Sequence, residues 1–295
     1  MHLLIYPVVA ALLYAIGSLF LKRSLAEGVG AWRTTFVCNV LLALLSLPLL
    51  FFTSWQPPGA GAHWYQPLIT GTTFFLGQVF TFLALNRGDV SVATPVLGTK
   101  AIFVAFLSVF LLHLSIPWTL WGAAVLTTVA LTLLGEGKLS PEARHKFVET
   151  LLYAGLSALT FSVTDVTTQK WCQPWGTAAF VPRFLGVCAI LSLALIPFFT
   201  GRLRDIEGKT LGWLGAGALL LSLQGLLLYV VIGHYGHATA INVVYNSRGL
   251  WTIILVWAFG SWFANTENRS GKTAMVGRLA GSILLLLAIV LVAAF

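Results

Sequence analysis

The sequence predicts an all-α integral membrane protein whose ten transmembrane helices form two inverted five-helix repeats. Composition, run lengths and internal similarity lead to this fold class. Of the 295 residues, 58% are hydrophobic and only 9% are charged, whereas soluble domains carry about 25% charged residues. Mean hydropathy is +0.90. These values exclude an ordinary soluble domain, so the net charge of +8 is first of all information about topology.

Ten apolar runs are each long enough to cross a bilayer, which takes about 17–25 residues in a helix. β-Strands with open edges cannot face lipid, so these runs are predicted to be helices. The predicted spans are 3–21, 34–52, 66–85, 90–112, 118–134, 151–169, 177–199, 211–232, 238–262 and 274–295.

The two halves of the chain resemble each other. The segment from Arg33 to Cys38 recurs 150 residues later as Arg183 to Cys188. Five spans are an odd number, so the second repeat enters the membrane from the opposite side, as in the inverted repeats of secondary transporters. We therefore divide the chain into repeat 1 (1–134), a polar linker (135–147) and repeat 2 (148–295).

The basic residues of the loops are distributed unequally between the two sides. Alternate assignment of the loops leaves Lys170 alone on the side of the termini. The positive-inside rule then predicts a multi-pass cell-membrane protein, of inner-membrane type, with both termini outside. The thirteen basic residues on the opposite side are Lys22, Arg23, Arg33, Arg87, Lys138, Arg144, Lys146, Arg202, Arg204, Lys209, Arg269, Lys272 and Arg278.

Charged side chains within the predicted spans are candidate functional residues, because a charge at the bilayer centre costs about 2.5–3.5 kcal/mol or more. Lys100 and Arg248 lie deep in the fourth and ninth spans, 148 residues apart. Inverted symmetry places them face to face across a central cavity. Asp165 lies deep in the sixth span and is a candidate for proton coupling, whereas Arg183 is close enough to the end of its span to snorkel.

Two interpretations of these charges are open. Asp165 forms a buried ion pair with Lys100 or Arg248 that holds helices together, or the excess positive charge binds an anionic substrate, with Arg248 gripping a carboxylate or phosphate. Further substrate-binding candidates share helix faces with Arg248 or lie at similar depth in neighbouring spans. They are Tyr245, Asn242, Asn246, Trp251, Gln78 and Gln224, with Tyr6 and Tyr14 as weaker candidates.

The segment LALNRGDVSVATPV (83–96), with its small residues and proline before the fourth span, resembles the drug/metabolite transporter superfamily, specifically its EamA-like ten-helix permeases. The resemblance implies a five-plus-five fold and export as the common role. It also implies termini in the cytoplasm, in conflict with the charge bias. The phosphate-translocator branch has a lysine in span 4 and a basic pair in span 9. Lys100 matches the first, but Ser247-Arg248 departs from the second, so phosphate and carboxylate both stay open.

The predicted function is secondary active transport of a small anionic or zwitterionic metabolite by alternating access, as export or exchange. Alternatives are a broad-specificity drug exporter, a lipid-headgroup flippase or, in another class, a non-transporting receptor or an intramembrane enzyme. We predict no enzymatic activity, no cofactor and no metal. The expected partners are a small-molecule substrate and the lipid bilayer, without nucleic acid, and both a monomer and a homodimer are compatible with the sequence.

Overall fold

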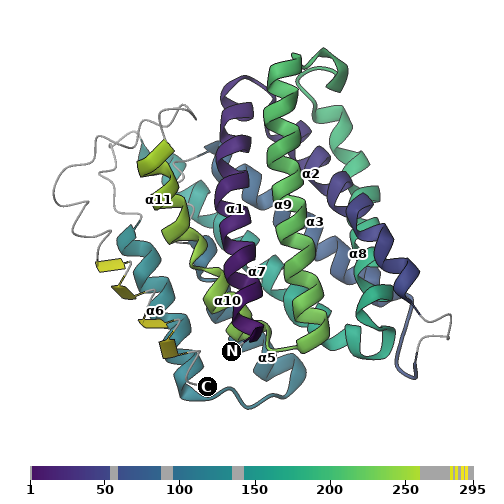
Figure 1. Cartoon of the computed structure of the whole chain (residues 1–295), viewed down its shortest axis with the longest axis vertical. Helices are drawn as coiled ribbons and strands as arrows, with labels where there is room; N and C mark the ends of the chain where they lie inside the picture. Colours follow the sequence, from purple (N-terminus) through teal and green to yellow (C-terminus); the bar gives the residue numbers. More distant parts are fainter. Residues whose placement is uncertain are drawn as a thin grey trace.

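The computed structural model describes residues 2–53, 59–87, 96–134 and 143–259, together with 280–281, 283–284, 287–288 and 290–291. The described residues form helices without strands (Figure 1). The helices are α1 (His2–Ala26), α2 (Ala31–Ser46), η1 (Leu47–Phe52), α3 (Tyr65–Arg87), α5 (Lys100–Leu112), α6 (Trp118–Leu134), α7 (Ala143–Trp175), α8 (Thr177–Ser192), η2 (Leu193–Phe198), η3 (Leu203–Asp205), α9 (Gly208–Tyr235), α10 (Ala238–Tyr245) and α11 (Arg248–Phe259).

Five helical segments are long and apolar enough to cross a membrane, and two shorter apolar helices accompany them. The long segments are 3–26, 31–52, 65–84, 177–198 and 208–235. An all-helical membrane fold is thus confirmed. Most of the family-like segment 83–96, most of the polar linker 135–147 and most of the predicted last span lie outside the described residues.

The predicted continuous spans 4 and 9 are both interrupted. Span 4 has a turn at Thr99, immediately before α5, and span 9 has a turn at Asn246 and Ser247, between α10 and α11. Backbone hydrogen bonds at the turns reach back three residues, from Thr99 to Val96 and from Ser247 to Val244. This tighter spacing ends one α-helix and begins another. Such a turn cannot be seen in an apolar run, because a turn inside a span does not require the polar residues that mark a loop in water.

The helices α2 and α8 share one local design. Each has 16 residues, follows a glycine with positive φ (Gly30 and Gly176) and continues into a six-residue 3-10 helix. These equivalent starts are 146 residues apart, not the 150 inferred from the Arg33 and Arg183 segments. The Arg33 and Arg183 segments are therefore not equivalent in the structure, because they are offset by about one helical turn. Arg33 is buried near the start of α2, whereas Arg183 is exposed further along α8.

The closest helix pairs join the N-terminal and C-terminal halves of the chain: α1 packs along α9, and α3 packs along α7 (Figure 1). In the first pair, Gly17 and Gly217 allow close approach, because a Cβ on Gly217 would lie 2.9 Å from the backbone nitrogen of Leu21. The second pair is joined by hydroxyl groups along its length, which interhelical hydrogen bonding in membranes favours. These contacts are Thr70–Thr167 at 3.0 Å, Thr73–Thr164 at 2.9 Å and Thr81–Ser157 at 2.6 Å.

The connection between α1 and α2 lies beside the connection between α8 and α9, at the top of Figure 1. Arg33 donates to the Gly28 carbonyl at 2.8 Å and to the Thr200 hydroxyl at 3.2 Å. Glu27 accepts a 2.7 Å hydrogen bond from Thr210 at the start of α9. These contacts hold the two connections together at the end of the molecule where the sequence places most of its basic residues.

Candidate functional site

Lys100 and Arg248 line the same cavity, as the sequence predicts. Each is the first residue of the helix that follows an interruption, α5 for Lys100 and α11 for Arg248. The partial positive charge of a helix N-terminus therefore adds to each cation. The cavity has a volume of about 80 Å³, several times the roughly 10–15 Å³ that one water molecule needs.

Lys100 forms an ion pair with Asp165. Its Nζ lies 2.7 Å from Asp165 Oδ2, and the Asp165 side chain is fully buried. The same oxygen accepts a 2.6 Å hydrogen bond from Asn242 Nδ2, while Oδ1 makes no hydrogen bond to the described residues. The structure therefore contains the ion pair foreseen in the first interpretation of the intramembrane charges.

Arg248 has a different environment from Lys100. Its guanidinium lies over the rings of Tyr14 and Tyr245, 4.7 Å from each centroid. Its Nη1 donates to the Tyr245 hydroxyl at 3.3 Å, and that hydroxyl donates to Gln224 Oε1 at 2.8 Å. No carboxylate in the described parts of the chain forms an ion pair with Arg248. The aromatic faces stabilise the cation but bring no formal negative charge to it.

The other predicted site residues divide into two groups. Tyr245, Gln78 and Gln224 line the cavity, and Gln78 donates to Asn39 at 3.2 Å. Three others do not line it but surround it. Asn242 supports Asp165, Asn246 donates to the Gly98 carbonyl at 3.0 Å, and Trp251 packs against a buried hydrophobic cluster.

Several cavity residues were not singled out by the sequence. The aromatic residues Phe74, Phe161 and Tyr229 line the cavity, and Lys100 Nζ lies 5.5 Å from the centroid of the Phe161 ring. Tyr229 packs against Phe74, with 5.5 Å between the ring centroids. They sit among 20 phenylalanines and seven tyrosines in an apolar chain, so no local signal distinguishes them. One indication for Phe161 is that residues 158–161 resemble residues 11–14, so Phe161 corresponds to Tyr14.

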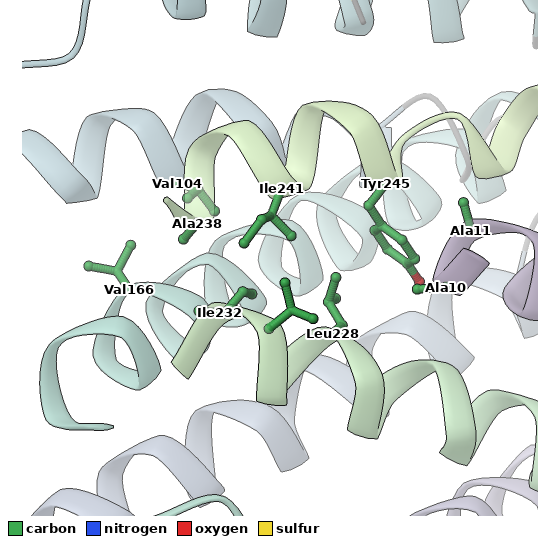
Figure 2. Packing of buried hydrophobic residues seen from close by; sticks show 10 residues of the cluster. Ala10, Ala11, Val104, Val166, Leu228, Ile232, Ala238, Ile241 and Tyr245 are labelled. Carbon is green, nitrogen blue, oxygen red and sulfur yellow. The ribbon is translucent and has the colours of Figure 1, made fainter. Parts of the chain in front are cut away.

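A buried hydrophobic cluster adjoins the cavity. Side chains of α1, α5, α7, α9 and α10 converge in it, as Figure 2 shows, and its members Leu228 and Tyr245 also line the cavity. The last turns of α7 and α9 are in close contact, because a Cβ on Gly233 would lie 2.7 Å from Cys172 Sγ. The buried cluster contains Ala10, Ala11, Val104, Val166, Leu228, Val231, Ile232, Ala238, Ile241 and Tyr245.

Arg183 is separate from this site. It is exposed on α8, donates to the Ala179 carbonyl at 2.6 Å and stacks on Trp175 at 5.2 Å. Among the described residues, no group of three or more His, Cys, Asp or Glu side chains is placed to hold a metal ion.

Comparison with known proteins agrees with this architecture. Residues 2–135 match the EamA-like transporter family, which confirms the resemblance seen in the sequence and supports a membrane transporter of the drug/metabolite superfamily. One solved structure, whose title reads only "Crystal structure of protein", has a similar fold, with a TM-score of 0.73 and 15% sequence identity. The alignment covers 99% of this chain and 98% of the other chain. At that identity it supports the fold alone. No curated protein has a matching sequence.

Proposed function

We propose that this EamA-like transporter moves a small metabolite bearing a carboxylate or phosphate across the membrane by alternating access. The observation that carries the proposal is Arg248, which lines a cavity together with Lys100 and forms no ion pair with the described residues. A buried cation is stable when a counter-charge reaches it, and guanidinium binds carboxylate and phosphate through paired hydrogen bonds.

The helix packing supports an inverted-repeat transporter. If spans 1 to 5 correspond to spans 6 to 10, the α1–α9 pair is the counterpart of α7–α3, and both pairs are extensive. The turns before Lys100 and Arg248 are also counterparts. Discontinuous helices that meet at a central site are typical of such transporters.

One pair of helices departs from this symmetry and suggests how access alternates. α7 packs against α9, whereas their counterparts α1 and α3 share no comparable interface among the described residues. The α7–α9 contact includes Cys172 and Gly233, in the last turns of the two helices. We propose that in the opposite state α1 and α3 close while α7 and α9 separate, so that the site faces the other side.

Asp165 couples this movement to protons in the proposal. Its carboxylate pairs with Lys100 while the substrate binds at Arg248, and later protonation breaks this pair so that the helices can rearrange. A carboxylate buried beside cations is suited to such a role. We expect an inward or outward pH gradient to drive transport in the wild type and to have no effect on Asp165→Asn.

The test is counterflow in proteoliposomes with radiolabelled lactate and radiolabelled glycerol 3-phosphate, one carboxylate and one phosphate. We expect exchange of at least one anion, lost in Arg248→Gln and strongly reduced in Lys100→Gln. Arg183→Gln is the matched control, because it removes an intramembrane arginine that does not line the cavity. Unchanged transport in Arg248→Gln and Lys100→Gln would overturn the proposal, as would exchange of organic cations alone.

A further inference from the structure

We infer that the site selects a monoanion, a single carboxylate on a largely apolar body, over phosphate esters and zwitterions. The inference rests on the proposed function and narrows it, and three features of the cavity carry it. They are the net charge of the site, the chemistry of the ligand group that would face Arg248, and the hydrogen bonds that the neutral polar residues of the cavity already make.

The charges of the described residues at the site sum to one positive unit. Lys100 and Asp165 compensate each other at 2.7 Å. Within the described parts of the chain, the hydrogen-bond and ring partners of Arg248 are neutral, namely the hydroxyl of Tyr245 and the rings of Tyr14 and Tyr245. Because Lys100 is already neutralised, a ligand that arrives at the intact ion pair meets one cation with unused hydrogen-bond donors.

This charge matches one class of ligand. A carboxylate brings a single negative charge and leaves the occupied site neutral. A phosphate monoester carries about −1.5 to −2 at pH 7 and leaves a negative excess in a medium where uncompensated charge is costly. A zwitterion has no net charge, so the occupied site keeps one positive charge. Its ammonium group would also lie near Lys100 and Arg248, while the carboxylate of Asp165 is already paired with Lys100.

The neutral polar residues of the cavity are already hydrogen-bonded within the protein. Gln78 donates to Asn39 at 3.2 Å, and Gln224 accepts from Tyr245 at 2.8 Å. Ser222 donates to the Cys38 carbonyl at 3.4 Å, and Thr81 donates to the Gly77 carbonyl at 2.9 Å. A ligand rich in hydroxyl groups would lose its hydrogen bonds to water and gain few hydrogen bonds in the cavity, which is unfavourable.

The remaining wall is apolar and aromatic. It suits a hydrocarbon or ring body, since apolar surface gains by leaving water. A ligand with its carboxylate on Arg248 would place this body against side chains from four helices, α2, α3, α7 and α9, and from the segment before α5. These apolar lining residues are Leu42, Phe74, Leu97, Phe161, Leu221 and Leu228.

The experiment uses four ligands that share a benzene ring and differ in charge: phenylacetate, phenyl phosphate, phenylalanine and phenethylammonium. Binding to the full-length protein in detergent is measured by calorimetry and by the shift in melting temperature. We expect phenylacetate to bind about tenfold or more tightly than each of the others, because every other ligand leaves a net charge in the site.

Variants of the ion pair test the charge count itself. Asp165→Asn leaves two cations, so the preference should move toward phenyl phosphate by about tenfold. The double variant Lys100→Met with Asp165→Asn restores a single cation and should again prefer phenylacetate. Size-exclusion profiles identify variants that do not fold, and the wild-type ligand series stands without them.

The outcomes separate this inference from the proposed function. Stronger binding of phenyl phosphate or phenylalanine by the wild type would overturn the monoanion preference and leave an anion or zwitterion transporter standing. Preference for phenethylammonium would overturn both. An unchanged preference in a folded Asp165→Asn protein would show that the charge count does not set selectivity.

Discussion

The side-chain amide of Asn246 donates a 3.0 Å hydrogen bond to the carbonyl of Gly98, and this bond joins the two helix interruptions directly. The residues are 148 positions apart, the same separation as Lys100 and Arg248. The bond therefore connects equivalent places in the two halves and holds the starts of α5 and α11 beside one another. It explains how two cations from distant segments come to share one cavity.

Replacing Asn246 with leucine should separate the two interruptions. The variant leaves the Gly98 carbonyl buried without its partner, which costs about 1–3 kcal/mol, and it weakens ligand binding by displacing Arg248. Thermal unfolding and calorimetry measure the two effects. Thr252→Val is the control, because its hydroxyl bonds only to the Arg248 carbonyl of its own helix. Equal effects of the two substitutions would contradict the role of the Asn246 bond.

Removing one member of the Lys100–Asp165 pair should destabilise the protein more than removing both. Loss of a single partner from a buried ion pair costs about 3–5 kcal/mol, whereas apolar replacement of both is often neutral. We therefore expect Asp165→Leu to unfold at a clearly lower temperature than Lys100→Met with Asp165→Leu. If the double variant is the less stable one, the pair contributes net stability of its own.

Gly217→Ala should push α1 and α9 apart. Its Cβ would meet the Leu21 backbone nitrogen at 2.9 Å, and overpacking of this kind costs about 1–3 kcal/mol. Gly215→Ala on the same helix meets nothing within 4 Å and should remain within about 1 kcal/mol of the wild type. Melting temperatures in one detergent decide the comparison, and similar values for both variants would argue against a tight α1–α9 contact.

Gly233→Cys should form a disulfide with Cys172 and lock α7 to α9. A Cβ at position 233 lies 2.7 Å from Cys172 Sγ, within the reach of a bridge, after a small shift of Thr177. Oxidation with copper phenanthroline should stop counterflow, and dithiothreitol should restore it. Gly233→Cys with Cys172→Ser should be insensitive to the oxidant. Full transport in the bridged protein would show that α7 and α9 do not separate.

Glu27, which joins the end of α1 to the start of α9, should make the stability of the protein depend on pH. Hydrogen bonds from Thr210 and Arg23 hold the pKa of Glu27 below its ordinary value of 4.5. A depressed folded-state pKa stabilises the protein above the unfolded-state pKa, and this contribution is lost as pH falls through the folded-state value. The melting temperature of the wild type should therefore exceed that of Glu27→Gln at neutral pH and converge with it below about pH 4. A constant difference down to low pH would contradict the assignment.

The sequence predicted the features that depend on local composition and on internal similarity. Apolar run lengths located most of the helices, and the shared offset of Lys100 and Arg248 predicted that both face one cavity, which both of them line. The rotation of each helix about its axis was less accessible, because helices that are apolar on every face show no periodicity. For this reason Asn242 and Trp251 were expected to line the cavity and do not, while Tyr229 does.

The register of the second span shows a related limit. Arg33 and Arg183 carry similar neighbouring letters, yet the structure aligns Gly30 with Gly176 instead. A glycine with positive φ begins each helix, and backbone conformation at that point sets which residues face the core. A shift of four residues moves a side chain one turn along the helix and only about 40° around its axis, so Arg33 lies near the start of α2 whereas Arg183 lies further along α8.

The pairing of α1 with α9 also has a consequence for the order in which the protein is made. Gly17 finds its partner surface at Gly217, 200 residues later, and α3 likewise waits for α7. Contacts so distant in sequence form late and slowly. Most of the protein must therefore be synthesised and inserted before α9 can pack against α1. The first half emerging alone presents its glycine and threonine faces to lipid or to chaperones, and a chain truncated before α9 should be removed by proteolysis rather than accumulate.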